Sequence, residues 1–411
     1  MTPPDYSAFK ERTPLAFLSS RGNLCLEVNT VGSHFPLNRR STEGFDDSGS
    51  MSSNQLSREE GPNMNIQQGI QAAVDGVDLS QSEAADVMAQ IMGGEATEAQ
   101  FGAFVTALRM KGETPDEIAG MASVMRNVSL HVSPGVDTVD TCGTGGDAMG
   151  WFNISTAASF VVAGAGVHVA KHGNRAMSGS TGSADVLEAL GVNVMLGPEG
   201  VFRCIQEAGI GFMFAQAFHP AMRFAGPLRP QIGIRTVFNI LGPLTNPAGA
   251  KRQVLGVADR ATAEKIAKAL QLLGTDYALV VHAESGADEV DIEGHTLMYQ
   301  VMPDVLKRRR TRPADFGLPE GSREHLVAES VEHSAEIIQT VLSGAGGEHN
   351  APPSPERSRY NVVAINAAVA LLAAGKADSF NDAALMAKDS IDSGAAATKL
   401  AALVKVSSGL G

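Results

Sequence analysis

Two glycine-dense turns within the stretch Asp137–Val194 constrain the fold of this chain more than any other feature. Each turn lies between a short β-rich run and an alanine-rich run of helical character. In the first turn, Gly143, Gly145 and Gly146 carry no Cβ atoms, so a ligand's oxygen atoms can approach the backbone N–H groups. A helix is predicted to begin at residues 153–156 (NIST), and a helix N-terminus offers unpaired N–H donors and a positive dipole end. The first turn therefore indicates a site for phosphate groups.

The second turn adds positive charge to the same pattern. It begins where Lys171 ends the apolar run Val167–Ala170, and it continues with His172, Gly173, Asn174 and Arg175. The next polar residues, Ser178, Gly179, Ser180 and Thr181, lead into another predicted helix. Cations and small hydroxyl groups at the start of a helix suit a large anion.

Two other nucleotide-binding patterns fit this stretch less well. The spacing Gly143-x-Gly145-x-x-Ala148 formally matches a dinucleotide fingerprint, which requires an acidic residue near the end of the next strand. That strand ends in Lys171 instead, and Asp147 would repel a pyrophosphate with no cation beside it. The Walker pattern fails because no Gly-Lys-Ser/Thr follows at the required spacing. Two plain structural loops would not need so many polar residues.

The composition argues against several other classes of protein. A formal net charge of −13 and a pI near 5.2 disfavour a nucleic-acid-binding surface. No run approaches 18 apolar residues, so no membrane span is expected. The cysteines, Cys25, Cys142 and Cys204, are scattered without metal-ligand spacing, which predicts a cytoplasmic protein without a disulfide framework. Cys142 lies beside the first glycine turn, but no paired histidine favours it as a nucleophile.

The chain is predicted to have three parts. Residues 1–63 are rich in Ser, Pro, Asn and charged residues without a helical or strand period, so we expect a disordered extension. Met64, where the pattern changes, is the expected start of the folded part and a candidate start of translation. Residues 64–135 are predicted to form a small helical domain, joined by helices from about 220–240. Residues 136–411 are predicted to form a large α/β domain that carries the anion site.

Local signals predict the individual elements. The capping pairs Ser80/Glu83, Thr97/Gln100 and Thr114/Glu117 indicate three helix starts in the helical part. Strands are predicted at 192–196, 211–215, 253–257 and 277–282, and helices at 198–208 and 262–273. This alternation predicts a mainly parallel sheet with helices on both faces, whose ligand crevice lies at the carboxyl ends of the strands. The KRRR run at 307–310 is predicted to be a solvated loop, and helices at 360–374 and 383–392 are predicted to complete the domain.

Several segments, taken together, resemble one enzyme family. They are GTGGD (143–147), FNIST (152–156), KHGNR (171–175), GSADVLEALG (182–191), HPAM (219–222), IRTVFNILGPLTNP (234–247) and the pair Asp288-Glu289. The family is that of the anthranilate phosphoribosyltransferases of tryptophan biosynthesis, and the resemblance extends from about Met64 to the C-terminus. It implies a nucleoside phosphorylase/phosphoribosyltransferase-like α/β fold, with a smaller all-helical domain through which the chain forms a homodimer.

The resemblance implies a magnesium-dependent glycosyltransferase. The enzyme would transfer phosphoribose from 5-phosphoribosyl 1-diphosphate, the donor, to anthranilate. The products would be N-(5-phosphoribosyl)anthranilate and diphosphate, in the second step of tryptophan synthesis from chorismate. No residue is required as a nucleophile or base, because an oxocarbenium-like transition state is stabilised mainly by positioning and charge neutralisation.

The resemblance also implies a role for each candidate site residue. The donor-binding set is Gly143, Gly146, Asp147, Asn153, Ile154, Ser155, Thr156, Lys171, His172, Gly173, Asn174, Arg175, Ser178, Gly179 and Ser183. The anthranilate-binding set is Gly143, Asn174 and Arg229. The metal-binding set is Ser155, Asp288 and Glu289, with two Mg²⁺ ions per subunit. Adjacent carboxylates on a surface turn are usually just solvated, but a bound pyrophosphate needs a divalent cation to offset its charge.

Two rival functions are left open by the residues. A nucleoside phosphorylase would share the expected fold, but its phosphate loop is expected to read closer to KHSTGG than to KHGNR. An inactive relative that binds nucleic acid would conflict with the net acidity of the chain and with its intact Asp288-Glu289 pair.

Three residues depart from the family pattern around the donor. Ala148 replaces a glycine, Trp151 replaces a hydroxyl residue, and Ser180 replaces a lysine. Ala148 costs about 1 kcal/mol or more if its φ is positive. The Trp151 ring must either pack outward under the loop or narrow the site. We therefore predict an active enzyme with weakened donor binding.

Overall fold

The computed structural model describes residues 63–176, 181–348 and 353–410. The extension predicted at residues 1–63 therefore lies outside the described residues, apart from Asn63. Three residues of the second turn, Ser178, Gly179 and Ser180, also lie outside them.

Four helices come first in the described chain: α1 (Ile66–Val74), α2 (Gln81–Gly93), α3 (Glu98–Lys111) and α4 (Pro115–Asn127). Each begins with a capping box, in which the N-cap side chain accepts the N3 backbone N–H and the N3 side chain accepts the N-cap N–H. The N-caps are Asn65, Ser80, Thr97 and Thr114. The three capping pairs predicted from the sequence are thus confirmed.

Seven strands form one sheet in the order β3-β2-β1-β4-β5-β6-β7. Their bounds are β1 Thr138–Gly143, β2 His168–Gly173, β3 Ile210–Phe214, β4 Arg252–Gly256, β5 Tyr277–Ala283, β6 Thr296–Met302 and β7 Val305–Thr311. The first five strands pair in parallel, whereas β6 and β7 are antiparallel additions at one edge. The expected mainly parallel sheet is confirmed.

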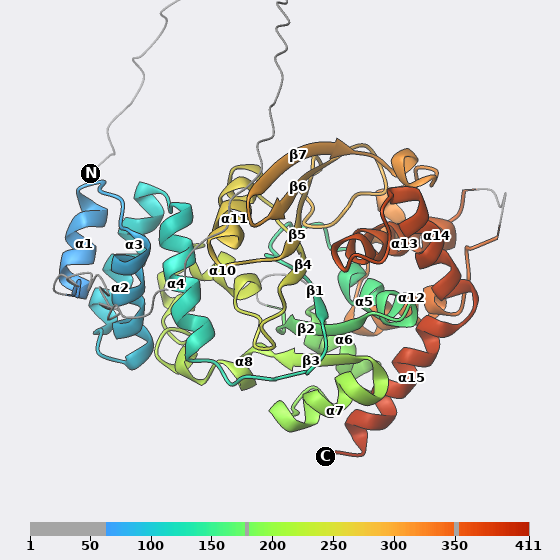
Figure 1. Cartoon of the computed structure of the whole chain (residues 1–411), viewed down its shortest axis with the longest axis horizontal. Helices are drawn as coiled ribbons and strands as arrows, with labels where there is room; N and C mark the ends of the chain where they lie inside the picture. Colours follow the sequence, from blue (N-terminus) through green and yellow to red (C-terminus); the bar gives the residue numbers. More distant parts are fainter. Residues whose placement is uncertain (1–62, 177–180, 349–352, 411) are drawn as a thin grey trace, which may run out of the picture. The chain divides into compact units, whose positions relative to one another are not determined.

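Helices lie on both faces of this sheet (Figure 1). The longer ones are α5 (Ile154–Gly164), α7 (Pro198–Ala208), α11 (Arg260–Leu272), α12 (Val331–Leu342), α13 (Pro355–Ala373), α14 (Phe380–Asp392) and α15 (Ala395–Ser408). The short ones are α6 (Ser183–Ala189), α8 (Ala215–Phe218), η1 (Pro220–Arg223), α9 (Arg229–Ile232), α10 (Phe238–Leu241), η2 (Gly242–Leu244), η3 (Pro313–Phe316) and η4 (Arg323–Leu326).

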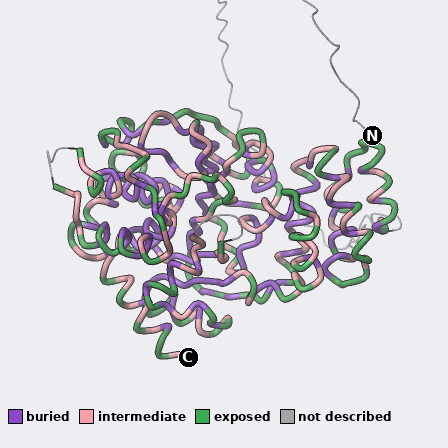
Figure 2. The backbone as a smooth tube through the Cα atoms, turned by 180° about the vertical axis from the view of Figure 1, so that it is seen from behind, coloured by how far each residue is buried: buried purple, intermediate pink, exposed green. Residues whose placement is uncertain are grey.

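The sheet separates two hydrophobic cores. Along β5, Leu279 and Val281 belong to the core that contains α5 and α13, whereas Ala278 and Val280 belong to the core that contains α11 and α2–α4. This division follows from the alternation of side chains along a strand. Figure 2 shows the buried segments concentrated where strands and covering helices meet. The second core also contains residues of the segment 225–244, so this segment packs with the N-terminal helices.

Three element predictions were wrong. Residues 192–196 form no strand. Val192, Val194 and Leu196 are buried as they would be in a strand. The N–H of Asn193, however, donates to the hydroxyl of Ser407 in α15 rather than to a neighbouring strand. The KRRR run is not a loop but most of the edge strand β7, which pairs with β6 and exposes its charged side chains. The helix 383–392 does not complete the fold, since α15 follows it.

No described helix is long and apolar enough to cross a membrane.

Candidate functional site

Both glycine turns follow neighbouring strands at the same edge of the sheet. Strand β1 ends at Gly143 and β2 ends at Gly173, and the two strands pair in parallel. The carboxyl ends of parallel strands are where open α/β sheets form their ligand crevices. The first turn leads to α5, for which Asn153 is the N-cap, and the second leads to α6, which begins at Ser183. The fold thus brings the two predicted phosphate loops side by side.

The acidic pair bonds directly to the first turn. The N–H of Gly145 donates to Asp288 Oδ2 at 2.7 Å, and the N–H of Ser155 donates to Glu289 Oε1 at 3.1 Å. A Cβ at Gly143 would overlap the Asp288 carboxylate, which explains why glycine is needed there. The predicted metal residues Ser155, Asp288 and Glu289 are therefore neighbours, although they are separated by more than 130 residues in the chain.

Burial makes this pair unusual. Burial, followed by the charge of Asp147, raises the pKa of Asp288 to about 7. Burial, followed by the charge of Asp288, raises the pKa of Glu289 to about 8. The negative charges of this cluster therefore repel one another. Within the described ranges, no three His, Cys, Asp or Glu side chains converge as a preformed metal cage.

Lys171 is buried beneath the acidic pair. Its Nζ donates to the backbone oxygen of Thr141 and lies 3.4 Å from Ser155 Oγ. Burial lowers its pKa, and the charges of Asp140 and Glu289 partly offset that effect. The lysine therefore faces β1 and the start of α5 rather than open solvent.

Asp140 in β1 anchors this region, although it was not among the residues predicted for the site. Its carboxylate accepts hydrogen bonds from the N–H of His172 at 3.2 Å, from Asn246 Nδ2 at 2.8 Å and from Gln253 Nε2 at 3.3 Å. Burial raises its pKa. Its position within a β-rich run just before the first glycine turn could have served as a signal, because a fully buried carboxylate needs several partners.

Arg235 belongs to a segment whose arginines the sequence marks as suited to a carboxylate or phosphate, but no site role was assigned to it. Its Nη2 donates to the backbone oxygen of Gly145 at 3.1 Å. Gly146 has φ 76°, and a Cβ there would overlap the Arg235 guanidinium. Arg235 thus brings a cation onto the first turn, beside Asp147.

The second turn is stabilised by its own ion pairs. Arg175 Nη1 lies 2.9 Å from Asp185 Oδ1 and 2.5 Å from Glu188 Oε2. The backbone oxygen of Asn174 accepts the N–H of Ala184 at 3.2 Å and the hydroxyl of Ser183 at 3.2 Å. The structure therefore brings Asn174, Arg175 and Ser183 together. The guanidinium of Arg175 is paired with two carboxylates of the protein itself.

Two buried histidines face each other behind this turn. His172 Nε2 and His219 Nε2 are 3.3 Å apart, and both side chains are buried. Burial lowers the pKa of His172 to about 3 and that of His219 to about 4. His172 is thus neutral at neutral pH and offers hydrogen bonding rather than charge.

Arg229 begins α9, in the segment that packs with the N-terminal helices. Its guanidinium carbon lies 5.9 Å from the centre of the Phe238 ring, and burial lowers its pKa. A half-buried guanidinium beside an aromatic ring suits a planar aromatic carboxylate.

The start of α5 shows an uncapped arrangement. Asn153 makes no side-chain capping bond, and Ile154 is buried. Among the described residues, Thr156 Oγ1 is the one buried side-chain polar atom without a hydrogen-bond partner. Such an atom is costly unless a ligand or water satisfies it.

Two of the three departures from the family pattern can be located. Ala148 has φ 58°, which is the only positive φ among the described residues other than glycine. Its backbone is therefore strained. Trp151 pairs with Val327 in an isolated bridge, and its ring packs partly buried against the core containing α5, so it lies under the loop. Ser180 lies outside the described residues.

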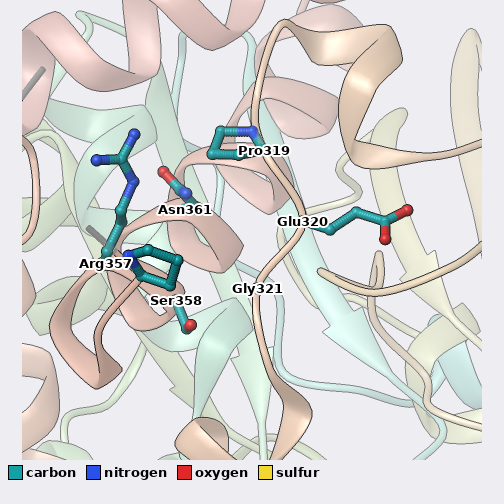
Figure 3. Close-up of a pocket in the computed structure, with 7 residues that line it drawn as sticks. Pro319, Glu320, Gly321, Arg357, Ser358 and Asn361 are labelled. Carbon is teal, nitrogen blue, oxygen red and sulfur yellow. The ribbon is translucent and has the colours of Figure 1, made fainter. Parts of the chain in front are cut away.

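The described residues line two cavities, one beside the glycine turns and one at the start of α13. A small one of about 10 Å³ is lined by Thr141, Ser155, Glu289 and neighbouring residues, which is near the volume that one water molecule needs. A larger one of about 150 Å³ lies between Pro319–Gly321 and the start of α13, where Arg357, Ser358 and Asn361 line it (Figure 3). None of its lining residues belongs to either glycine turn, so it is separate from the candidate site.

Comparisons with known proteins agree with this geometry. The family model described as "Glycosyl transferase family, a/b domain" matches residues 135–397, and "Glycosyl transferase family, helical bundle domain" matches residues 67–129. The chain is 54% identical to an anthranilate phosphoribosyltransferase of Chloroflexus aurantiacus, over 84% of this chain and 100% of the relative. It is 52% identical to that of Herpetosiphon aurantiacus, again over 84% and 100%.

Solved structures of the same name are similar in fold. The anthranilate phosphoribosyltransferase of Thermus thermophilus superposes with a TM-score of 0.76 at 40% identity, covering 82% of this chain and 98% of the other. The Saccharomyces cerevisiae enzyme, in complex with PRPP and Mg, gives a TM-score of 0.76 at 26% identity, covering 84% and 98%. PRPP is 5-phosphoribosyl 1-diphosphate. By fold, site geometry and relatives, the chain belongs to the anthranilate phosphoribosyltransferase family.

Proposed function

We propose that this protein transfers phosphoribose from 5-phosphoribosyl 1-diphosphate to the amine of anthranilate and releases diphosphate. The observation that carries the proposal is the meeting of two glycine turns and a partly buried acidic pair at the carboxyl ends of adjacent parallel strands. Such an arrangement can hold a large anion together with the cation that offsets its charge.

The donor-binding residues of the first turn would act through the backbone. The N–H groups of Gly145 and Ser155 are the ones that Asp288 and Glu289 now accept from. When the donor binds, we infer that its diphosphate oxygens accept these N–H groups, while Asp288 and Glu289 would hold the metal. Gly143, Gly146, Asp147 and residues 153–156 would line the diphosphate. The unpartnered hydroxyl of Thr156 would gain a partner in this step.

The second turn would hold the remaining phosphate. Lys171, His172, Gly173 and Asn174 line the end of β2, and Ser178 and Gly179 are proposed to continue the loop. Arg175 would have to exchange at least one of its two carboxylate partners for a phosphate oxygen. This exchange is feasible because the partners are partly exposed and such pairs contribute little to stability.

The acidic residues fit magnesium. Mg²⁺ is usually held by one or two carboxylates, waters and substrate phosphates rather than by a complete protein cage. Asp288, Glu289 and the hydroxyl of Ser155 offer such a donor set, and the charge repulsion among the carboxylates favours a cation. We propose two Mg²⁺ ions per subunit, which supply positive charge to the leaving diphosphate.

Anthranilate would be oriented by Arg229, Asn174 and the backbone at Gly143. The low basicity of its aromatic amine leaves the lone pair available, so no general base is needed. As the N–C bond to the anomeric carbon forms, the C–O bond to diphosphate breaks, and the nitrogen then loses one proton to water or to the released diphosphate. The protein would act mainly by holding the two reactants in line and by stabilising the developing charge.

The domain organisation and the association of two copies are also part of the proposal. We propose that residues 64–135 and about 220–240 form a helical domain, that residues 136–411 form the donor-binding domain, and that two copies associate through the helical domain as a cytoplasmic homodimer. Exposed apolar residues such as Val74, Val77 and Met110 on or beside the helical part support an interface there.

One assay tests the activity directly. The fluorescence of anthranilate should fall when the protein is mixed with 5-phosphoribosyl 1-diphosphate and Mg²⁺, and the loss should stop when the metal is chelated. A parallel reaction with inorganic phosphate and a pyrimidine nucleoside should show no turnover. Turnover in the second reaction without the first would establish a nucleoside phosphorylase instead.

A further inference from the structure

Ser334 lies in α12, far from both glycine turns in the sequence, yet it bonds to the start of α5. Its Oγ accepts the backbone N–H of Asn153 at 3.1 Å and donates to Asn153 Oδ1 at 2.9 Å. The serine is 0% exposed, so solvent cannot replace it. The contact spans 181 residues of chain. Figure 1 shows α12 beside α5 and α6.

The two hydrogen bonds change what Asn153 does. Asparagine is among the most favoured N-cap residues because its side-chain oxygen accepts an N–H of the first turn. Asn65 at the start of α1 makes this bond, whereas Asn153 at the start of α5 makes none. The reason is geometric, since Ser334 occupies Asn153 Oδ1 and the Nδ2 donates to the backbone oxygen of Thr181 at 3.2 Å.

The bond to Thr181 joins the two turns. Thr181 lies just before α6, at the end of the second turn, whereas Asn153 ends the first. Asn153 held by Ser334 therefore sets the distance between the two loops that would bind opposite ends of the donor. It also keeps the Asn153 carboxamide away from the N–H of Ser155, which Glu289 accepts in this structure and which an anion could accept in its place.

We propose that Ser334 is a positioning residue for donor binding, an inference that rests on the proposed function. It prevents Asn153 from capping its own helix and holds the carboxamide across to the second turn. Without the serine hydroxyl, Asn153 is expected to rotate and cap α5, because a cap of this kind stabilises a helix start. The helix would keep its stability, but its N-terminus would be closed to phosphate.

If Ser334 had only a structural role, its loss would lower the stability of the protein without weakening donor binding specifically. The chain provides a matched control for this distinction. Ser390 is also a buried serine whose hydroxyl bonds to α5, donating to the backbone oxygen of Val161 at 2.7 Å. It touches the opposite end of the same helix. Each serine to alanine change removes a buried hydroxyl that bonds to this part of the chain, through two hydrogen bonds at Ser334 and one at Ser390, but only Ser334 contacts the donor-binding end.

The test measures binding of 5-phosphoribosyl 1-diphosphate with Mg²⁺ by calorimetry, together with thermal unfolding. Ser334→Ala should weaken the donor Kd about three- to tenfold, the range expected for one hydrogen bond. Its Tm should stay near that of the wild type, and its KM for anthranilate should be unchanged. Ser390→Ala should instead lower the Tm and leave the donor Kd within twofold.

A double-mutant cycle completes the design. In an Asn153→Ala background, Ser334→Ala should change the donor Kd by less than twofold, because the residue it positions is gone. The inference is overturned if Ser334→Ala binds the donor like the wild type, if Ser390→Ala weakens it equally, or if the two changes at 153 and 334 add. Absence of donor binding by the wild type would instead overturn the proposed function, and this inference with it.

Discussion

The two glycine turns end neighbouring strands, yet opposite charges stabilise them. The first turn is bonded by carboxylates, with Asp288 on the N–H of Gly145 and Glu289 on the N–H of Ser155. The second turn contains cations that are already paired, Arg175 with Asp185 and Glu188. Both turns therefore place protein groups where a phosphate-containing ligand would bind.

The difference indicates how each turn can accept an anion. The partly buried carboxylates of the first turn stay beside the ligand even when they release these N–H groups, so a cation must accompany the ligand there. The pairs of the second turn are partly exposed and easily exchanged, so the loop itself can supply the charge. One ligand with two separate anionic groups, one of them metal-bound, would satisfy both turns at once.

The largest effect is expected from removing the acidity of the first turn. The double change Asp288→Asn with Glu289→Gln keeps the acceptor oxygens for Gly145 and Ser155 but removes both charges. Magnesium-dependent turnover should fall on the order of 1,000-fold, since metal-based charge stabilisation contributes several kcal/mol. Circular dichroism should be unchanged.

The control for this change is Glu284→Gln, which removes an exposed carboxylate paired with Arg310. It should leave turnover within twofold. Near-normal activity of the double variant would show that the acidic pair serves the loop structure rather than a metal.

Arg229→Ala should weaken binding of the acceptor, anthranilate, without affecting the two glycine turns that would bind the donor. It should raise the KM for anthranilate about 10- to 100-fold, the value of one charged hydrogen bond of ~1.5–3 kcal/mol, with little change for the donor. Arg223→Ala, in the preceding short helix η1, provides the control. Equal effects of Arg229→Ala on both substrates would point to a folding role.

The histidine pair behind the second turn predicts a pH dependence of stability. The folded-state pKa values of about 3 for His172 and about 4 for His219 lie below the unfolded value of about 6.5. Above pH 6.5 neither state binds a proton, so this contribution to stability is complete. As the pH falls from 6.5 towards 4, the unfolded chain binds protons first, and each histidine destabilises the fold by about 1.4 kcal/mol per pH unit.

Urea unfolding at several pH values between 7 and 4.5 measures this slope. His219→Gln should reduce the slope of unfolding free energy against pH by about 1.4 kcal/mol per pH unit, the contribution of one histidine. His131→Gln, at an exposed position, should leave the slope unchanged. Identical slopes for the wild type and His219→Gln would show that the pair titrates normally in the folded protein.

The smallest effect concerns the strain of the first turn. Ala148→Gly should stabilise the protein by about 1 kcal/mol, because glycine adopts φ 58° without a Cβ clash. Calorimetry should show a Tm higher by roughly 2 °C. A lower Tm would mean that the backbone relaxes at Ala148 and that alanine is not strained there.

Local sequence signals predicted much of the fold. The capping boxes were found because their partners are three residues apart, and the parallel strands because each alternates with a helix. The error at 192–196 arose because alternating burial under a helix resembles alternating burial in a sheet. The error at 307–310 arose because four charges say nothing about a backbone whose partner is β6.

The candidate site also contains both residues that sequence motifs predicted and residues that they did not. The glycine turns, Lys171 and the acidic pair were found from motifs, and the structure brings them together. Asp140 and Ser334 were missed, and Arg235 was assigned no role, because their partners are distant, Gly145 lying 90 residues from Arg235 and Asn153 lying 181 residues from Ser334. The sequence does not show which partner such a polar residue has until the fold places the two side by side.

The edge strand β7 has a consequence for self-association. An edge strand presents one row of unpaired N–H and C=O groups, to which a strand of another molecule can add. Here Lys307, Arg308, Arg309 and Arg310 follow one another along that strand, and Arg310 is paired with Glu284. Two copies approaching edge to edge would therefore bring together six positive charges without such a partner among the described residues, and their repulsion disfavours the addition of another strand.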